Sequence, residues 1–476
     1  MPDSRLTADQ TSVRRKAREF AQREILPVAW YYDEQDYIPL DILKKAFEAD
    51  IISADIPAQY GGKGYRLLDI VMMIEEIAAA CPGIAMSIFD NSLSIAPLML
   101  SRNEGLKARC LTDIASSFKL ICFAASEPVV ADSAAGCRCR AEAEGDGFIL
   151  NGTIYSVING AIADYMCVFA DTKTSGVSKG VGAFLVDLAS PGVSVSRPTP
   201  RLGQRCSHAA GIAFRDVFVA ASGMMAEPGE GRELAVKAFN RIRPMIAAYA
   251  VGTARAAMEF AADHADRHRD VGTPGADIET IETRLDGMQK KVVAARLLTW
   301  KSAWELDEGR NGALRPSMAR IYGMAWDLAN DAMQIFGGYG GTHAMAAEKL
   351  FRDIRLLRIY ENICEIQRII LAGAVMDNSG RLHLSARDSV GERKRDLVVS
   401  PDGLLRWHCR TCGNVYYGKK PHTACPYCFF PKKIFSEVPA DPGRRDIEYH
   451  DMAKGKDKQA CRSLIHHKEQ RKTKEV

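Results

Sequence analysis

Four cysteines near the end of the chain form its clearest chemical motif. Cys409 and Cys412 make one C-x-x-C pair, and Cys425 and Cys428 make a second. Each short loop turns two sulfurs toward one point, so the two pairs can place four thiolates at the corners of a tetrahedron. Tetrahedral sulfur coordination suits zinc or a single iron, and the spacing alone does not choose between them. The motif predicts a small metal domain over residues 403–436.

The other nine of the 13 cysteines are scattered and have no framework spacing. Such cysteines in a large chain are typical of buried thiols in a reducing compartment. The first ten residues, MPDSRLTADQ, lack the apolar core of a secretory signal. No stretch is long and apolar enough to cross a bilayer. We therefore expect a cytoplasmic protein without a membrane span.

Charge is spread unevenly along the 476 residues, whose formal net charge is +4. Residues 396–476 contain 16 Lys+Arg and 10 Asp+Glu, so the rest of the chain carries a net charge of −2. A basic end of this kind is more often a solvated tail than a nucleic-acid contact. We expect residues 437–476 to be a disordered basic tail, and we expect no nucleic acid partner.

Hydrophobic patterning divides the remaining chain into blocks that would position any active site. Residues 1–118 show helical spacing, with a turn at Pro57 to Gly62 and an apolar helix from about Leu67 to Ala80. Residues 119–227 contain short β-branched segments separated by Gly, Asn and Asp, which predict an antiparallel sheet.

Helical spacing returns in residues 228–376, and residues 377–402 are polar and charged, as in a linker. In one of these helices a buried face is predicted for Leu285, Met288, Val292, Leu298 and Trp304. The predicted fold class is therefore α+β and multidomain, because each helical block must cover its apolar face.

Residues 5–376 resemble the acyl-CoA dehydrogenase family through motifs that occur in family order and at family spacing. These motifs are Pro57 to Gly62, Ala125 to Pro128, Asn151-Gly152, Asn159-Gly160, Arg243-Pro244, Gln334 to Gly340, Ile359 to Glu361 and Ile366 to Arg368. The resemblance implies an N-terminal α domain, a central β domain and a C-terminal four-helix bundle. It also implies a homotetramer or homodimer with FAD bound between subunits.

The family's reaction assigns a role to Glu361. The α-proton of a thioester is a poor acid, so a carboxylate must face it while the developing enolate is stabilised. The β-hydrogen leaves as hydride to flavin N5. Glu361 matches the family's base, whose apolar pocket raises its pKa. Some members place the base near Arg243 instead, but residues 239–243 contain no carboxylate.

Other residues acquire binding roles from the same resemblance. Arg243 and Tyr360 would bind the acyl thioester, although Arg243 also fits a structural ion pair at a helix end. Ser126 would contact the flavin pyrimidine. Gln334 would hold the FAD pyrophosphate and adenosine, and Gly337 and Gly338 would let the backbone approach the phosphates. His268 stands where the family has an arginine for the pyrophosphate.

Several positions depart from the family pattern. Val129 to Ser133 replace a glycine-containing loop, Ser156 replaces a Trp that packs on the flavin, and Ile158 replaces a Thr that bonds flavin N5. Two interpretations stay open. The chain is an active enzyme with a retuned flavin, or it is a non-catalytic member that acts as an electron-relay or assembly module. A flavin oxidase or monooxygenase on the same fold is a third alternative.

Residues 403–436 resemble the rubredoxin-like domain found at the end of rubrerythrins. The resemblance rests on the four cysteines together with Trp407, Val415, Gly418 and Pro421. It implies one iron and one-electron transfer, with a structural zinc ribbon as the alternative. Family members usually pass electrons to electron-transfer flavoprotein, and a tethered metal centre would assist or replace that partner. The predicted function is acyl-CoA dehydrogenation, or the reverse enoyl-CoA reduction.

Overall fold

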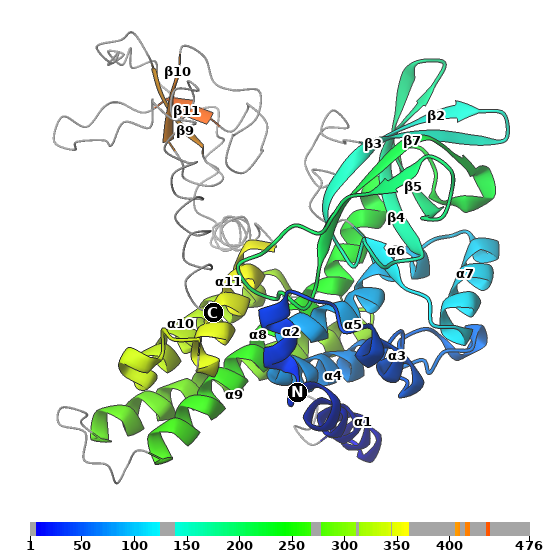
Figure 1. The fold of residues 1–476 in the computed structure, drawn as a ribbon. Helices are drawn as coiled ribbons and strands as arrows, with labels where there is room; N and C mark the ends of the chain where they lie inside the picture. The colour runs from blue at the N-terminus through cyan, green and yellow to red at the C-terminus, as the bar shows by residue number, and fades with distance from the viewer. Residues whose placement is uncertain are drawn as a thin grey trace, which may run out of the picture. The chain divides into compact units, whose positions relative to one another are not determined.

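The computed structural model describes residues 6–123, 139–267, 278–310, 314–343, 345–360, 405–409, 415–418 and 435–437. The chain divides into two compact units, residues 1–383 and residues 384–476. Helices and a large sheet form the first unit (Figure 1).

The first part of the larger unit is helical, as its periodicity predicts. Its helices are α1 (Ala8–Phe20), α2 (Ala29–Gln35), α3 (Leu40–Glu48), α4 (Leu67–Ala80), α5 (Pro82–Ser94), α6 (Ala96–Met99) and α7 (Glu104–Ser116). A capping box between Thr7 and Gln10 begins α1. The predicted bounds of α4 are confirmed. Most side chains of α4 and all of those of α5 are buried, so this pair forms the centre of the helical core.

The predicted turn before α4 depends on two glycines. Residues Ala58–Tyr60 form a single 3₁₀ turn, and Gly61 follows it with a φ of 85°. A Cβ on Gly62 would lie 2.1 Å from the carbonyl oxygen of Ile56. Only glycine lets the backbone reverse this closely.

A mixed sheet follows the first helices. Its strands are β1 (Ile121–Phe123), β2 (Arg140–Glu144), β3 (Gly147–Ile158), β4 (Tyr165–Thr174), β5 (Val177–Asp187), β6 (Val193–Val195), β7 (Ala209–Ala220) and β8 (Met224–Ala226). The order is β6-β7-β3-β2-β4-β5-β8, and β1 pairs with β4. The expectation of a wholly antiparallel sheet is wrong, because β1 and β2 both run parallel to β4. Alternating side chains do not specify strand direction, which the connections between strands decide.

Side chains of the sheet pack into two hydrophobic cores. One lies inside the β domain and includes Leu150, Phe184 and Phe214. The other joins the sheet to the helices through Phe123 and Phe169. Strand β3 reaches the second core at its end, where its register with β7 shifts between Ile154 and Val157.

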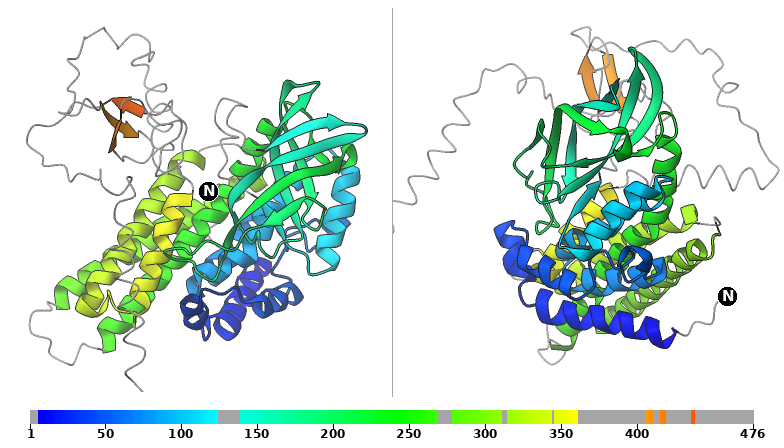
Figure 2. Two further views of the ribbon diagram at one scale, coloured as in Figure 1. Left: turned by 45° about the horizontal axis from the view of Figure 1, so that its top comes forward. Right: turned by 90° about the vertical axis from the view of Figure 1, so that its right-hand side faces the viewer.

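Four long helices complete the larger unit: α8 (Gly231–Arg267), α9 (Ile278–Asp307), α10 (Leu314–Phe336) and α11 (Ala346–Tyr360). Helix α8 packs against β5 near its start and against α4, α9, α10 and α11. The long green and yellow helices lie side by side in the left view of Figure 2. On α9 the predicted face is buried at Met288 and Val292 and half-buried at Leu285, Leu298 and Trp304. Helix α8 therefore contacts N-terminal helices, the sheet and the other three helices of the bundle.

The second unit contains an antiparallel sheet in the order β10-β9-β11, formed by β9 (Leu405–Cys409), β10 (Val415–Gly418) and β11 (Phe435–Glu437). Cys409 is the last residue of β9. Cys412, Cys425 and Cys428 lie outside the described residues, as do the predicted linker and nearly all of the predicted tail. Elsewhere in the described chain, no cluster of three or more His, Cys, Asp or Glu side chains could hold a metal. None of the helices described here is both long and apolar enough to cross a membrane.

Candidate active site

The end of β1 and the first half of α8 lie side by side. The rings of Phe123, the last residue of β1, and Phe239 have centroids 5.8 Å apart. Phe123 precedes Ser126 by three residues, and Phe239 precedes Arg243 by about one helical turn. This aromatic contact therefore joins the two segments that carry predicted flavin and substrate residues.

Arg243 is half-buried, and its Nη1 donates to Oδ1 of Asn240 at 2.5 Å. An ion pair in this segment is formed by Arg241, whose Nη2 lies 3.6 Å from Oδ2 of Asp55. The Ser92 hydroxyl donates to Asp55 Oδ1 at 2.8 Å. Burial raises the pKa of Asp55, and Arg241 and Ser92 oppose that rise. Arg241 thus fixes this part of α8 to the N-terminal domain.

Helix α11 leads directly to the predicted base. Its last residue is Tyr360, which precedes Glu361 in the chain. Helix α11 packs against α8, α10 and α5. Glu361, Ser126 and His268 lie outside the described residues, and the Tyr360 side chain is not described. Their assigned roles stay predictions.

The turn after α10 is open to a group that approaches from outside. Gln334, Gly337 and Gly338 are exposed, and Tyr339 is 66% exposed. Gly337 has a φ of 57°, and a Cβ added to Gly337 or Gly338 would meet nothing within 4 Å. Glycine is the residue that adopts this backbone conformation at low cost. An exposed amide beside a bare backbone turn fits a phosphate-bearing cofactor such as FAD.

The two departures on β3 differ in their surroundings. Ser156 is exposed and has a φ of 57°, inside the register shift of this strand. Ile158 is half-buried and packs against the helical core. A serine here offers a small hydroxyl where the family has an indole, and Ile158 offers only apolar surface.

A buried carboxylate on α5 is absent from the sequence predictions. Asp90 is 4% exposed, and its Oδ2 has no hydrogen-bond partner among the described residues. Burial raises the pKa of Asp90 well above its usual range, against opposing effects of Ser94 and Arg201. In the sequence, Asp90 could have been noticed as the one acidic residue within the largely apolar segment Pro82–Ser94.

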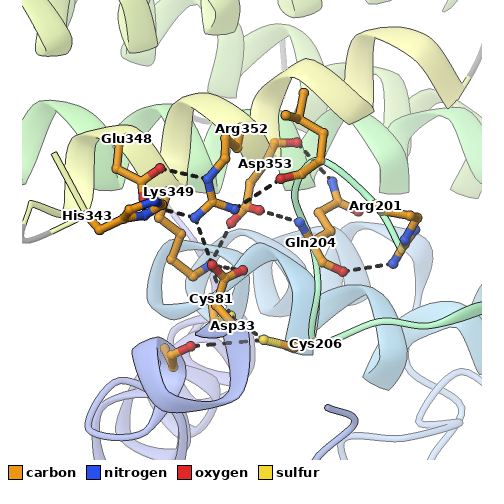
Figure 3. A network of polar contacts seen from close by, with 12 residues as sticks. Asp33, Cys81, Arg201, Gln204, Cys206, His343, Glu348, Lys349, Arg352 and Asp353 are labelled. Atoms are coloured by element: carbon orange, nitrogen blue, oxygen red, sulfur yellow. Dashed lines mark hydrogen bonds and ion pairs between the residues drawn. The ribbon is translucent and has the colours of Figure 1, made fainter. Parts of the chain in front are cut away.

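A second polar group joins four distant segments, and we call Asp33, Cys81, Cys206, Lys349 and Asp353 the lysine–thiol cluster (Figure 3). Cys81 lies between α4 and α5, and Cys206 lies between β6 and β7. Their Sγ atoms are 3.9 Å apart. Lys349 Nζ lies 3.5 Å from Cys81 Sγ, 2.6 Å from Asp353 Oδ2 and 3.8 Å from Asp33 Oδ1.

Electrostatics make the two thiols unequal. The Cys206 thiol lowers the pKa of Cys81 through its hydrogen bond, burial opposes the effect, and Lys349 adds to it. The pKa of Cys206 is raised by the same bond and by burial. The six cysteines described in the larger unit are free and buried, which confirms the prediction of buried thiols for these six. The contact between Cys81 and Cys206 is not predictable from the sequence, because 125 residues separate the two positions.

Three family models match the chain in order. They are the acyl-CoA dehydrogenase N-terminal domain at residues 7–117, the middle domain at residues 122–217 and the C-terminal domain at residues 229–376. These matches confirm the predicted sequence of helical, β and helical domains. None of the three models extends into residues 377–476.

Similarity to individual proteins leads to the same family. The mitochondrial short-chain specific acyl-CoA dehydrogenase of Rattus norvegicus is 32% identical over 368 residues, which are 76% of this chain and 89% of the relative. Butyryl-CoA dehydrogenase from Megasphaera elsdenii superimposes with a TM-score of 0.73 at 27% identity, covering 79% of this chain and all of that chain. A chain from a structure described as the electron transferring flavoprotein of Acidaminococcus fermentans gives a TM-score of 0.72 at 28% identity, covering 79% and 99%. The predicted enzyme class is thereby confirmed: this chain belongs to the acyl-CoA dehydrogenase family.

Proposed function

We propose that this protein removes hydrogen from the α and β carbons of an acyl-CoA thioester, or catalyses the reverse enoyl-CoA reduction. The observation that carries the proposal is the complete set of three family domains, matched in order over residues 7–376. FAD, when bound, supplies the hydride acceptor. The relatives that act on butyryl-CoA and other short-chain thioesters favour a small acyl group as the first substrate to try.

Glu361 is the proposed base, and it takes the α-proton. Helix α11 ends one residue earlier, so any interaction that fixes α11 limits where this carboxylate can reach. Arg243 and Tyr360 are the proposed thioester contacts. Arg243 is supported by its position on α8, one turn beyond the contact between Phe239 and Phe123.

FAD would be held by residues from several segments, namely Ser126, His268, Gln334, Gly337 and Gly338. The exposed turn at Gly337 and Gly338 supports this assignment, because its backbone is open to an approaching pyrophosphate. We propose that the flavin lies between subunits of a homodimer or homotetramer. The scattered buried thiols favour the cytoplasm as the place of reaction.

Electrons would leave the flavin one at a time. Electron-transfer flavoprotein is one proposed acceptor, and the similarity to a chain from an electron transferring flavoprotein structure supports it. The second proposed acceptor is a rubredoxin-like iron centre on Cys409, Cys412, Cys425 and Cys428, with zinc as the alternative metal. Two C-x-x-C pairs carry that assignment.

Replacing the proposed base tests the reaction. Glu361→Gln should abolish turnover of butyryl-CoA with an artificial electron acceptor while the protein keeps its flavin spectrum. Glu233→Gln is the matched control, because Glu233 is an exposed glutamate on α8 that pairs with Lys237. Unchanged turnover in Glu361→Gln would rule out Glu361 as the base.

The relay alternative keeps one observation in its favour. Ser156 and Ile158 lack the ring and the hydroxyl that family members offer to the flavin. The visible spectrum of the purified protein separates the two functions. Bound flavin that bleaches with an acyl-CoA supports the enzyme, and a ferric-thiolate spectrum without flavin supports the relay.

A further inference from the structure

Two buried thiols from different domains face each other at van der Waals range. Cys81 and Cys206 are both 0% exposed, and 3.9 Å separates their Sγ atoms. A disulfide requires about 2 Å between sulfurs, with the two Cα atoms within about 7 Å of each other. The two sulfurs would therefore have to approach by about 2 Å to form a bond.

The backbone around these thiols is already arranged for that approach. A Cβ on Gly83 would lie 3.2 Å from the Cβ of Cys206, so the absence of a side chain lets the loop reach α5. The Ser87 hydroxyl donates to the Cys206 carbonyl at 3.3 Å. Gln204, in the left-handed region with a φ of 48°, donates from Nε2 to the Asp353 carbonyl at 3.1 Å. These contacts hold the loop of Cys206 against both α5 and α11.

The two sulfurs have different surroundings, which assigns them different roles. Lys349 Nζ lies 3.5 Å from Cys81 Sγ, and the Cys206 thiol, which can act as a donor to that sulfur, lies 3.9 Å from it. A cation and a donor favour the thiolate form, which is the nucleophile in thiol chemistry. Cys167 offers the contrast, since its Sγ donates to the Ser94 carbonyl at 3.3 Å and burial raises its pKa.

We propose that Cys81 and Cys206 form a reversible disulfide site with hydrogen peroxide as the oxidant. The Cys81 thiolate attacks one peroxide oxygen, the O–O bond breaks, and hydroxide leaves and takes a proton to become water. The sulfur of Cys81 is then a sulfenic acid. The Cys206 sulfur attacks it, the S–S bond forms, and the sulfenic hydroxyl leaves with the Cys206 proton as a second water. Two thiols are oxidised while one peroxide is reduced.

The bond would act on the helix that precedes Glu361. It would remove the thiolate partner of Lys349 and join the junction of α4 and α5 to the loop before β7. Lys349 and Asp353 lie about three and about two turns before the end of α11. The proposal stands independently of the proposed reaction, because it rests on side chains outside the predicted flavin and thioester contacts.

Peptide mapping of the full-length protein tests the site. The reduced protein is treated with hydrogen peroxide, quenched in acid, alkylated in denaturant and digested without a reductant. The expected result is one linked pair of peptides carrying Cys81 and Cys206, lighter than the two free peptides by two hydrogen atoms. Dithiothreitol should restore both thiols. Peptides carrying Cys122 and Cys167 are internal controls and should stay reduced.

Two variants sharpen the result. Lys349→Met should slow formation of the linked peptide, by roughly threefold for each unit by which the Cys81 pKa rises, because the loss of thiolate is partly offset by the greater nucleophilicity of a more basic sulfur. Cys206→Ser should stop at a sulfenic acid on Cys81, which dimedone traps. Free Cys81 and Cys206 after treatment, or a bridge from either one to another cysteine, would overturn the proposal. The mapping of the unmodified chain decides this even if a variant fails to fold.

Discussion

Helix α4 and its end carry two buried polar clusters that connect the N-terminal domain to later parts of the chain. The lysine–thiol cluster is one. The other, which we call the arginine cluster, consists of Glu75, Glu76, Arg14, Arg18, Arg255 and Arg296. Glu76 Oε1 lies 2.6 Å from Arg14 Nε, and Glu76 Oε2 lies 2.8 Å from Arg255 Nη2. Glu75 Oε1 lies 2.6 Å from Arg296 Nη2. The arginine cluster thus joins α4 to α1, α8 and α9.

The two clusters differ in what can change. Guanidinium and carboxylate groups keep their charges across the physiological range, so the arginine cluster is a fixed link. The lysine–thiol cluster contains two sulfurs whose protonation and covalent state can both change. The arginine cluster therefore links the domains across the physiological pH range. The lysine–thiol cluster can change its charge with pH and its covalent bonding with oxidation.

The arginine cluster predicts the largest loss of stability. Glu76→Gln should lower the free energy of unfolding by about 3 kcal/mol or more, because buried guanidinium groups lose their carboxylate partner. The largest part of this loss should come from Arg255, since its side chain is only 10% exposed. The denaturant midpoint measures the change.

The control for this variant is Glu230→Gln. The exposed pair of Glu230 with Arg102 should contribute at most about 0.5 kcal/mol.

The pKa of Glu76 provides a second test. Burial alone would raise it, but Arg18, Arg255 and Arg14 together lower it, so its contribution is present above the unfolded pKa and disappears as the pH falls through the folded pKa. Glu76→Gln should therefore flatten the acid side of the stability profile. Equal midpoint shifts in the two variants would contradict a fixed link at Glu76.

The lysine–thiol cluster predicts a somewhat smaller loss on removal of its cation. Lys349→Met should cost about 2–3 kcal/mol, because Asp353 is fully buried and loses an ammonium at 2.6 Å. Lys237→Met is the matched control, since Lys237 forms an exposed pair with Glu233 at the same helical spacing. That change should alter the denaturant midpoint very little. A similar midpoint in both variants would show that the buried lysine stabilises nothing.

The comparison also shows which parts of the fold the sequence could predict. Helix α4 is predictable to its ends, because its apolar run is bounded by the Gly61-Gly62 turn and by Pro82. Strand direction is not predictable in the same way. The alternation in β4 is compatible with either direction of a neighbour, and the parallel pairing with β1 and β2 depends on how the chain returns to the sheet.

Candidate site residues divide along the same line. Residues in linear motifs, such as Gln334, Gly337 and Glu361, can be found by matching short segments in order. The lysine–thiol cluster contains no linear motif, because α2, the α4–α5 junction, the loop before β7 and α11 each contribute one or two residues. The i,i+4 spacing of Lys349 and Asp353 predicts an ion pair, but nothing in the sequence places a thiol beside it.

Close backbone approach gives the next largest expected effect. A Cβ on Gly203 would lie 2.5 Å from the carbonyl carbon of Arg352 and 2.7 Å from the backbone nitrogen of Asp353. Gly203→Ala should therefore push the loop of Cys206 away from α11 and cost about 1–3 kcal/mol. Gly287→Ala on α9 meets nothing within 4 Å and should raise stability by about 0.5–1 kcal/mol. Thermal unfolding would measure both, and no loss in Gly203→Ala, or an equal loss in Gly287→Ala, would contradict close backbone approach as the cause.

The smallest expected effect is a pH dependence of the unfolding free energy that the lysine–thiol cluster has and the arginine cluster lacks. The hydrogen bond from Cys206, aided by Lys349, lowers the pKa of Cys81 from 9.0 to about 7. The unfolded chain then binds more protons than the folded chain over that window, so the thiols should add stability as the pH rises from 7 to 9. Above pH 9 the raised pKa of Cys206 acts in the opposite direction, because the folded chain retains a proton that the unfolded chain loses.

The difference in unfolding free energy between the wild type and Cys81→Ser/Cys206→Ser should therefore peak near the ordinary thiol pKa of 9.0, with a gain of about 1 kcal/mol over its neutral value. Glu76→Gln should show no such peak, since no thiol belongs to the arginine cluster. A flat difference from neutral to alkaline pH would mean that Lys349 is neutralised by Asp353 and Asp33 alone. Cys81 would then be an ordinary thiol, and the contrast between a fixed and a changeable junction would be lost.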